Sequence, residues 1–194
     1  MPHMLVRAVR WNGSHATLLE WAREPFSLSS FNKGRRQRMN MLMALAVSIG
    51  VFIALWVKFG AMVAPGLAIA VPAGIIAWAC FYAAGGKMQG LQKAIASNVS
   101  GVVWVLLANL IIAAAGLQSM AWIVIGVVAF CIVMQSKVAA LSFIPGGFAG
   151  AAVTAASGAG GDIKANVMVA IALIAGALLG YISEMGAGMI ARKA

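Results

Sequence analysis

The residues that could carry chemistry in this chain are few. Its 194 residues include four acidic side chains, two histidines and two cysteines. Acid–base or nucleophilic catalysis needs a nucleophile and a base within hydrogen-bonding reach of each other, but both histidines lie in the first 15 residues. Cys80 and Cys131 each stand alone in an apolar run, where a cysteine behaves as a small buried side chain rather than as part of a metal centre. We therefore expect no enzyme activity, no metal and no cofactor.

Neutral polar side chains inside the apolar segments are the remaining candidates for a function. The segment 94–115 carries Asn98, Ser100 and Trp104. A polar side chain in lipid must find a hydrogen-bonding partner, so we expect this face to point into a bundle of helices. Two interpretations stay open: these side chains bond neighbouring helices together, or they form the polar wall of a narrow path for a solute.

A proline and two glycines interrupt the apolar segment 138–157. Proline lacks a backbone N–H and glycine weakens a helix, so this segment should either kink or break into half-helices and re-enter. Broken helices at membrane depth expose backbone groups that transporters use for binding, and close helix packing is the alternative. The residues assigned to a solute path here are Phe143, Pro145, Gly146, Phe148 and Gly150. If they line a path, Pro145→Leu or Gly146→Leu should abolish flux and leave membrane insertion intact.

Small residues recur every four positions in the last two apolar segments. One ridge is Gly146, Gly150, Thr154 and Gly158, and the other is Ala172, Gly176 and Gly180. Ridges of small residues let helices approach each other closely. We therefore assign Thr154, Gly176 and Gly180 to helix packing.

Six apolar segments must position these residues. The chain is 63% hydrophobic and 9% charged, against roughly 45–50% and about 25% in soluble domains, so lipid must be the solvent for much of its surface. The segments are 41–57, 61–84, 94–115, 119–134, 138–157 and 165–183. Crossing a hydrocarbon core of about 30 Å takes about 20 helical residues. We predict an all-α, polytopic transmembrane bundle of about six spans over residues 39–194.

The positions of the basic residues predict an orientation. Seven of the 14 lysines and arginines precede residue 39, and Lys87, Lys93 and Lys137 lie in alternate gaps between segments. Because cytoplasmic loops carry the excess of basic residues, both termini should lie in the cytoplasm. Residues 1–38 then form a basic cytoplasmic tail, which is either loosely ordered or an untranslated extension before Met39.

Three stretches beyond Met39 resemble a bacterial inner-membrane family catalogued as domain of unknown function 1097. They are Ser100–Trp104 (SGVVW), Gly126–Lys137 (GVVAFCIVMQSK) and Leu141–Gly150 (LSFIPGGFAG). The resemblance covers about four-fifths of the chain and implies an inner-membrane protein with few charges in its spans. It implies no activity, and residues 1–38 depart from its pattern.

The function that these observations favour is a passive channel or facilitator for a small solute. Neutral narrow pores select by diameter and hydrogen-bonding groups rather than by charge. We expect the lipid bilayer, a small solute and further copies of the same chain as partners, and no nucleic acid, because no basic face with interleaved aromatics is present. The alternative is a non-transporting membrane subunit or a scaffold of an envelope complex.

Overall fold

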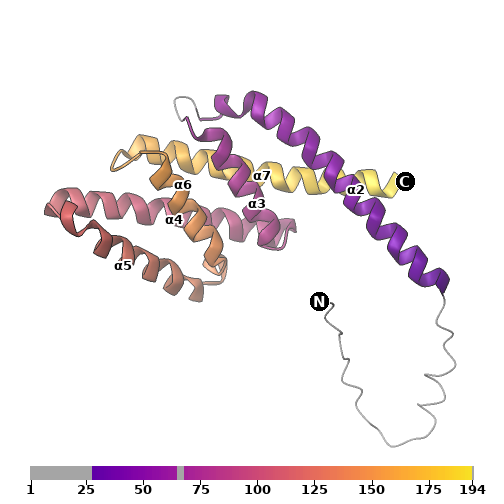
Figure 1. Ribbon diagram of the computed structural model, residues 1–194, viewed down its shortest axis with the longest axis horizontal. Coiled ribbons are helices and arrows are strands. Elements are labelled where there is room, and N and C mark those ends of the chain that lie inside the picture. Colours follow the sequence, from indigo (N-terminus) through magenta and orange to yellow (C-terminus); the bar gives the residue numbers. More distant parts are fainter. Residues whose placement is uncertain (1–27, 65–67, 194) are drawn as a thin grey trace, which may run out of the picture. The chain divides into compact units, whose positions relative to one another are not determined.

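The computed structural model describes residues 28–64 and 68–193, and every regular element within these ranges is a helix. The helices are α2 (Leu28–Phe59), α3 (Ala70–Ala83), α4 (Lys87–Ala115), α5 (Ala121–Met134), α6 (Ile144–Ala156) and α7 (Ile163–Lys193) (Figure 1). Short 3₁₀ turns are η1 (Gly60–Met62), η2 (Gln118–Met120), η3 (Gln135–Lys137) and η4 (Ala139–Leu141). The all-α prediction is confirmed.

The chain divides into two compact units, Met1–Arg38 and Met39–Ala194, and the contacts described below belong to the second. Most of the predicted tail, residues 1–27, lies outside the described residues. Residues 28–38 are helical and continue into the first apolar segment. These residues include good helix formers such as arginine and glutamine, and the basic cytoplasmic tail over residues 1–38 stays a prediction.

Four of the helical stretches are long and apolar enough to cross a membrane. They are Asn40–Phe59, Lys87–Ala115, Gln118–Lys137 and Ile163–Ala191. The other two helices, α3 and α6, have 14 and 13 residues, so each is only about 20 Å long against a hydrocarbon core of about 30 Å. The number of full crossings and the cytoplasmic position of both termini stay predictions.

Each short helix begins where a proline permits it. Pro72 is the third residue of α3 and Pro145 the second residue of α6. A proline fits the first turn because the N–H that it lacks has no helical partner there. The segments 61–84 and 138–157 were predicted as single spans, but each contains a 3₁₀ turn followed by a short helix. Pro145 therefore starts a helix rather than kinking one.

The six helices form two similar halves. Each half has a long apolar stretch, a short helix and a second long helix, α2–α4 in the first and α5–α7 in the second, where α5 is lengthened by the 3₁₀ turns η2 and η3 to the 20 residues Gln118–Lys137. Both short helices open with the same pattern, Val71-Pro72-Ala73-Gly74 in α3 and Ile144-Pro145-Gly146-Gly147 in α6. Corresponding helices run in opposite directions (Figure 1). The third helices show this in their contacts, because Lys87 at the start of α4 bonds to Glu184 near the end of α7.

The two inverted halves interlock. The most extensive contacts join each short helix to the third helix of the other half, α3 with α7 and α6 with α4. Glycines meet at both contacts: a Cβ added to Gly176 would collide with the Gly74 carbonyl oxygen, and one added to Gly101 would collide with the Gly147 carbonyl oxygen. Backbones that approach this closely gain van der Waals contact, which is the main attraction between helices in lipid.

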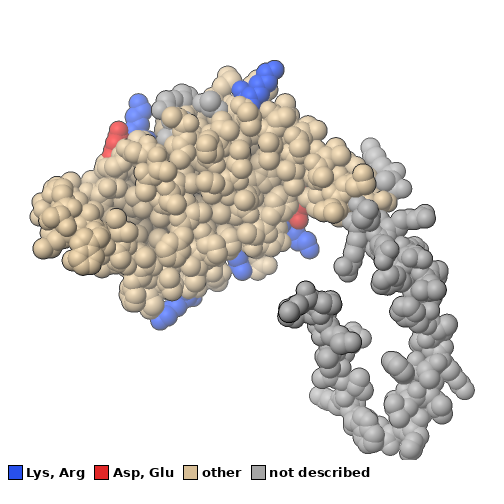
Figure 2. Space-filling view, viewed as in Figure 1, with Lys and Arg blue, Asp and Glu red and all other residues tan. Residues whose placement is uncertain are grey.

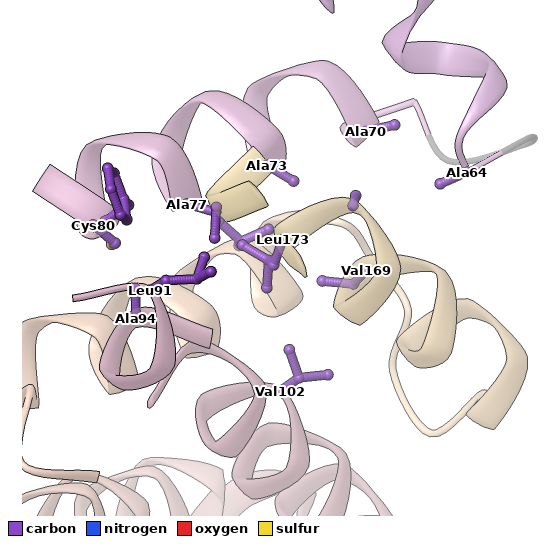
Figure 3. Close-up of a cluster of buried hydrophobic side chains, with 14 residues drawn as sticks. Ala64, Ala70, Ala73, Ala77, Cys80, Leu91, Ala94, Val102, Val169 and Leu173 are labelled. Carbon is purple, nitrogen blue, oxygen red and sulfur yellow. The ribbon is translucent and has the colours of Figure 1, made fainter. Parts of the chain in front are cut away.

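Small apolar side chains fill the space between these helices. The buried cluster includes Ala73, Ala77, Val102, Val169 and Leu173 (Figure 3). By contrast, the spans that contain α2 and α5 have most of their residues exposed. Figure 2 shows charged side chains at two opposite margins of the described surface, with a broad uncharged band between them. This distribution fits a bundle whose middle band faces lipid.

Candidate functional site

The first turns of α6 rest on the middle of α4. A Cβ added to Gly146 would lie 3.0 Å from the Ser97 side chain, and one added to Gly150 would collide with the Asn98 carbonyl group. Gly146, Gly147 and Gly150 are all buried. The absence of side chains along this edge of α6 therefore brings its backbone directly against Ser97 and Asn98.

Ser97 and Asn98 are fully buried, and they lack hydrogen-bonding partners. Both residues have 0% exposure. No described protein group bonds to the Ser97 Oγ, and the Asn98 amide has no partner of standard geometry beyond a weak contact with the Cys80 thiol. An unpaired buried amide or hydroxyl costs about 1–3 kcal/mol of stability. The two side chains therefore lower the stability of the folded protein.

A chain of hydrogen bonds holds α4 to α5 one turn further along. The Trp104 Nε1 donates to the Gln135 Oε1 at 2.9 Å, and the Gln135 Nε2 donates to the Ser100 Oγ at 2.8 Å. Ser100 in turn donates to the Ser97 carbonyl oxygen. Ser100 and Trp104 thus bond helices together in this structure, which is one of the two roles that the sequence left open.

An apolar groove of about 540 Å³ lies between α4, α5 and α6. Its walls include Phe148 and Thr154 from α6, Asn109 from α4 and Ile132 from α5. Phe148 is 42% exposed, and the Asn109 amide donates to Val105 in its own helix. The groove therefore runs beside α6 on the side next to α5, and its lining is almost entirely apolar.

The corresponding region beside α3, next to α2 and α7, contains aromatic side chains. The Trp56 ring covers Gly60 and Gly74, and its Nε1 donates to the Val71 carbonyl oxygen at 3.0 Å. Ser48 in α2 donates to the Ser183 carbonyl oxygen, and the Tyr82 hydroxyl bonds to the Ser183 hydroxyl. These contacts fasten α2 and α3 to α7.

The predicted path residues only partly converge. Gly146 and Gly150 contact Ser97 and Asn98, whereas Pro145 is exposed and Phe148 lines the groove. The packing residues lie as follows: Gly176 against Gly74, Gly180 against Trp78 and Phe81, and Thr154 buried with its hydroxyl on the Gly150 carbonyl oxygen. Gly158 lies beyond the end of α6 with a φ of 68°, so the first ridge stops at Thr154.

Gln135, Gly101 and Gly147 are contact residues that the sequence analysis did not single out. Gln135, the first residue of η3 directly after α5, bonds to α4, and the two glycines form a close backbone contact between α4 and α6. The repeated proline–x–glycine pattern at Pro72 and Pro145 was the signal that could have paired the short helices. In the part of the chain that the structure describes, no three His, Cys, Asp or Glu side chains are grouped as metal ligands would be.

Comparisons with known proteins give consistent matches. A family model described as "Protein of unknown function (DUF1097)" matches residues 46–188. The chain is 35% identical over 156 residues to the uncharacterized protein YahC of Escherichia coli K12, covering 76% of this chain and 92% of that protein. It is 33% identical over 159 residues to the inner membrane protein YcdZ of the same strain, covering 80% and 92%. The YcdZ protein of Salmonella typhimurium LT2 is 31% identical over 151 residues, covering 74% and 85%. No solved structure matches the chain significantly.

Proposed function

Since this chain belongs to the DUF1097 family and is a multi-pass protein of the bacterial inner membrane, we propose that it is a passive channel or facilitator for a small uncharged solute, and not an enzyme. The observation that carries the proposal is the pair of short, proline-led helices, one in each inverted half. Many transporters consist of inverted repeats whose discontinuous helices meet at a solute site near the bilayer midplane.

The charges of the chain support passive movement. As the structure bounds them, α3, α5 and α6 contain no Asp, Glu, Lys or Arg. Proton- and sodium-coupled carriers use carboxylates or other ionisable groups within their spans. A solute that moves along α6 would therefore meet backbone groups and neutral side chains, which select by size and hydrogen bonding.

The test is solute-driven swelling of liposomes that contain the purified protein, followed by light scattering. The solutes are urea, acetamide and glycerol, each compared with protein-free liposomes. Gly146→Leu is the decisive variant, because its side chain would press on Phe143 and Ser97 at the start of α6. Gly126→Leu is the matched control, since Gly126 is exposed on α5 with no atom within 4 Å of an added Cβ.

We expect faster swelling with the wild type and with Gly126→Leu, and little acceleration with Gly146→Leu. Size-exclusion chromatography and thermal unfolding would establish that all three proteins are folded, and would also report whether the protein is the homo-oligomer that we propose. If folded, inserted wild-type protein accelerates the entry of no solute, the facilitator is excluded. A non-transporting subunit of a larger envelope complex then becomes the better explanation.

A further inference from the structure

Ser97 and Asn98 are an adjacent pair of buried polar side chains that lack ordinary hydrogen-bonding partners. The Asn166 Oδ1 and the Trp78 Nε1 are also unpaired, but the Asn166 amide nitrogen donates to two carbonyl oxygens. Ser48, Thr154 and Ser183 are also buried, and each of their hydroxyl groups has a protein partner. Among the described residues, no group bonds the Ser97 hydroxyl. The Asn98 amide has only a weak contact, with the Cys80 thiol, and a thiol is a poor hydrogen-bonding partner. Native proteins leave few buried polar atoms unpaired, and those that persist call for a specific explanation.

The position of Asn98 is central in the bundle. Its backbone carbonyl lies against Gly150 in α6, and its side chain lies beside the Cys80 thiol in α3. Asn98 is therefore situated between the two short helices. Ser97, the preceding residue of α4, lies against Gly146 near the start of α6. In inverted-repeat transporters this is where solutes bind.

The fold itself does not require polar side chains at this position. Ser97 and Asn98 come four and three residues before Gly101, at the glycine contact of α4. At the same distances before Gly176, the equivalent contact of α7, the chain has Ala172 and Leu173. Both of these apolar residues are completely buried. The second half thus shows that apolar side chains satisfy the same packing environment.

We propose that Ser97 and Asn98 form the solute-binding site, and that the solute is a small uncharged molecule of the urea or primary amide class. The inference rests on the proposed function and gives it a site and a substrate class. The Asn98 amide offers a donor and an acceptor side by side, and urea or acetamide presents the complementary pair. Two hydrogen bonds can therefore form at once, with the Ser97 hydroxyl available for a third.

Access to this site requires α6 to move. The contact of Gly101 with Gly147 and that of Asn98 with Gly150 close the space between α4 and α6. On the other side of α6 lies the groove of about 540 Å³. A tilt of α6 toward α5 would occupy part of this groove and expose Ser97 and Asn98. In this proposal α6 is the helix that moves, and the contact between Gly101 and Gly147 marks the closed state of the site.

The first experiment compares Asn98→Leu with the wild type in the liposome assay. The variant copies the residue at Leu173, so it should fold, and its melting temperature should rise by a few degrees because an unpaired amide is removed. Urea and acetamide flux should fall about tenfold or more, since each lost hydrogen bond weakens binding by roughly that order. Ser97→Ala should cause a smaller loss. Gln118→Leu, an amide replacement in the exposed turn before α5, is the control.

A second experiment detects binding without transport. Iodoacetamide is itself a small primary amide, and the Cys80 thiol lies beside Asn98. Alkylation forms a bond from the Cys80 sulfur to the methylene carbon, iodide leaves, and the thiol proton goes to solvent. Mass spectrometry would follow the modification of Cys80, with Cys131 as the internal reference. Excess acetamide should slow the modification of Cys80 severalfold and leave Cys131 unchanged, and Asn98→Leu should remove this protection.

The two experiments separate the site from the function. Unchanged urea flux in folded Asn98→Leu, with no acetamide protection of Cys80, overturns the site while the facilitator stands. Protection of Cys80 that depends on Asn98, in a protein that accelerates no solute, supports the binding site and overturns the facilitator. If Asn98→Leu does not fold, Ser97→Ala and the wild-type protection assay decide, and the absence of an effect in both overturns the site.

Discussion

At the contact between α3 and α7, Gly74 meets Gly176, and at the inverted contact between α6 and α4, Gly147 meets Gly101. The backbone geometry of the two contacts is alike, but their surroundings differ. In the first, the Trp56 ring covers the glycine of the short helix, and in the second the smaller Ile132 side chain does so. A groove remains beside α6, between α4 and α5.

The same difference continues at the centre of each contact. Ala172 and Leu173 bury apolar surface in α7, whereas Ser97 and Asn98 bury unpaired polar atoms in α4. The centre of the contact between α3 and α7 is thus packed with apolar side chains, and the unpaired Trp78 Nε1 and Asn166 Oδ1 lie away from these two residues in sequence. The contact between α4 and α6 gives up packing and hydrogen bonds at the place where we propose that the solute binds, as functional sites commonly do.

The largest effect should come from adding a side chain at either glycine contact. Gly101→Val and Gly176→Val would each drive a Cβ into a backbone carbonyl oxygen, which cannot move without displacing a short helix. Overpacking of an adaptable core costs about 1–3 kcal/mol, but here the obstacle is backbone, so we expect a loss above about 5 kcal/mol, which single substitutions rarely reach. Thermal unfolding in detergent should show a large loss for both variants, compared with Gly126→Val. A large loss at one contact alone would mean that the halves are not equivalent.

The next largest effect should distinguish the two covering side chains. Trp56→Ala should lower the free energy of unfolding by about 3–5 kcal/mol, because it removes a buried ring together with its hydrogen bond to the Val71 carbonyl oxygen. Ile132→Ala should cost closer to 2 kcal/mol, since the cavity it leaves joins an existing groove. Trp56→Phe isolates the hydrogen bond. Equal losses for Trp56→Ala and Ile132→Ala would contradict the contrast between the filled surroundings of α3 and the open groove beside α6.

Composition and residue spacing were sufficient to predict the class of this fold. Long apolar runs with charges between them can be stable only as helices in lipid, because lipid offers no partner to an unpaired backbone group. The predicted third and sixth spans, 94–115 and 165–183, each lie inside a single helix of the structure, α4 and α7 respectively. The position of a membrane span can be predicted from hydrophobicity because it depends on contact with lipid, and not on which residues of other helices pack against the span.

The short helices could not be predicted from hydrophobicity, because the turns before them are as apolar as the helices. Pro72 and Pro145 occur inside continuous apolar runs, and only the structure shows that each begins a helix. Asn98 was identified from the sequence as a path candidate. Its lack of a partner was not predictable, because that property depends on α3 and α6, which are distant in the chain.

A smaller effect should follow from filling the groove. Ala155 lines it, and Ala156, the next residue in α6, is exposed and does not. Ala155→Leu should raise the free energy of unfolding by about 0.5–2 kcal/mol, the usual gain for cavity-filling changes. Urea flux should fall, because α6 loses the space into which it tilts. Ala156→Leu should change neither quantity, and undiminished flux in a stabilised Ala155→Leu would argue against movement of α6 into the groove.

The smallest effect should appear at the starts of α4 and α7, where a carboxylate accepts the first free backbone N–H groups. Asp162 does this for its own helix, accepting from the Lys164 N–H at 2.8 Å, whereas Glu184 reaches from α7 to the Lys87 N–H at 2.7 Å. Removing a cap costs about 0.5–2 kcal/mol, and less where solvent is close. In hydrogen exchange, Asp162→Ala should accelerate only the first turn of α7. Glu184→Ala should instead accelerate the first turn of α4, which is distant from Glu184 in the chain but bonded to it through the Lys87 N–H. Faster exchange at the start of α7 in both variants would show that each substitution destabilises the whole bundle. The two caps would then not act separately on α4 and α7.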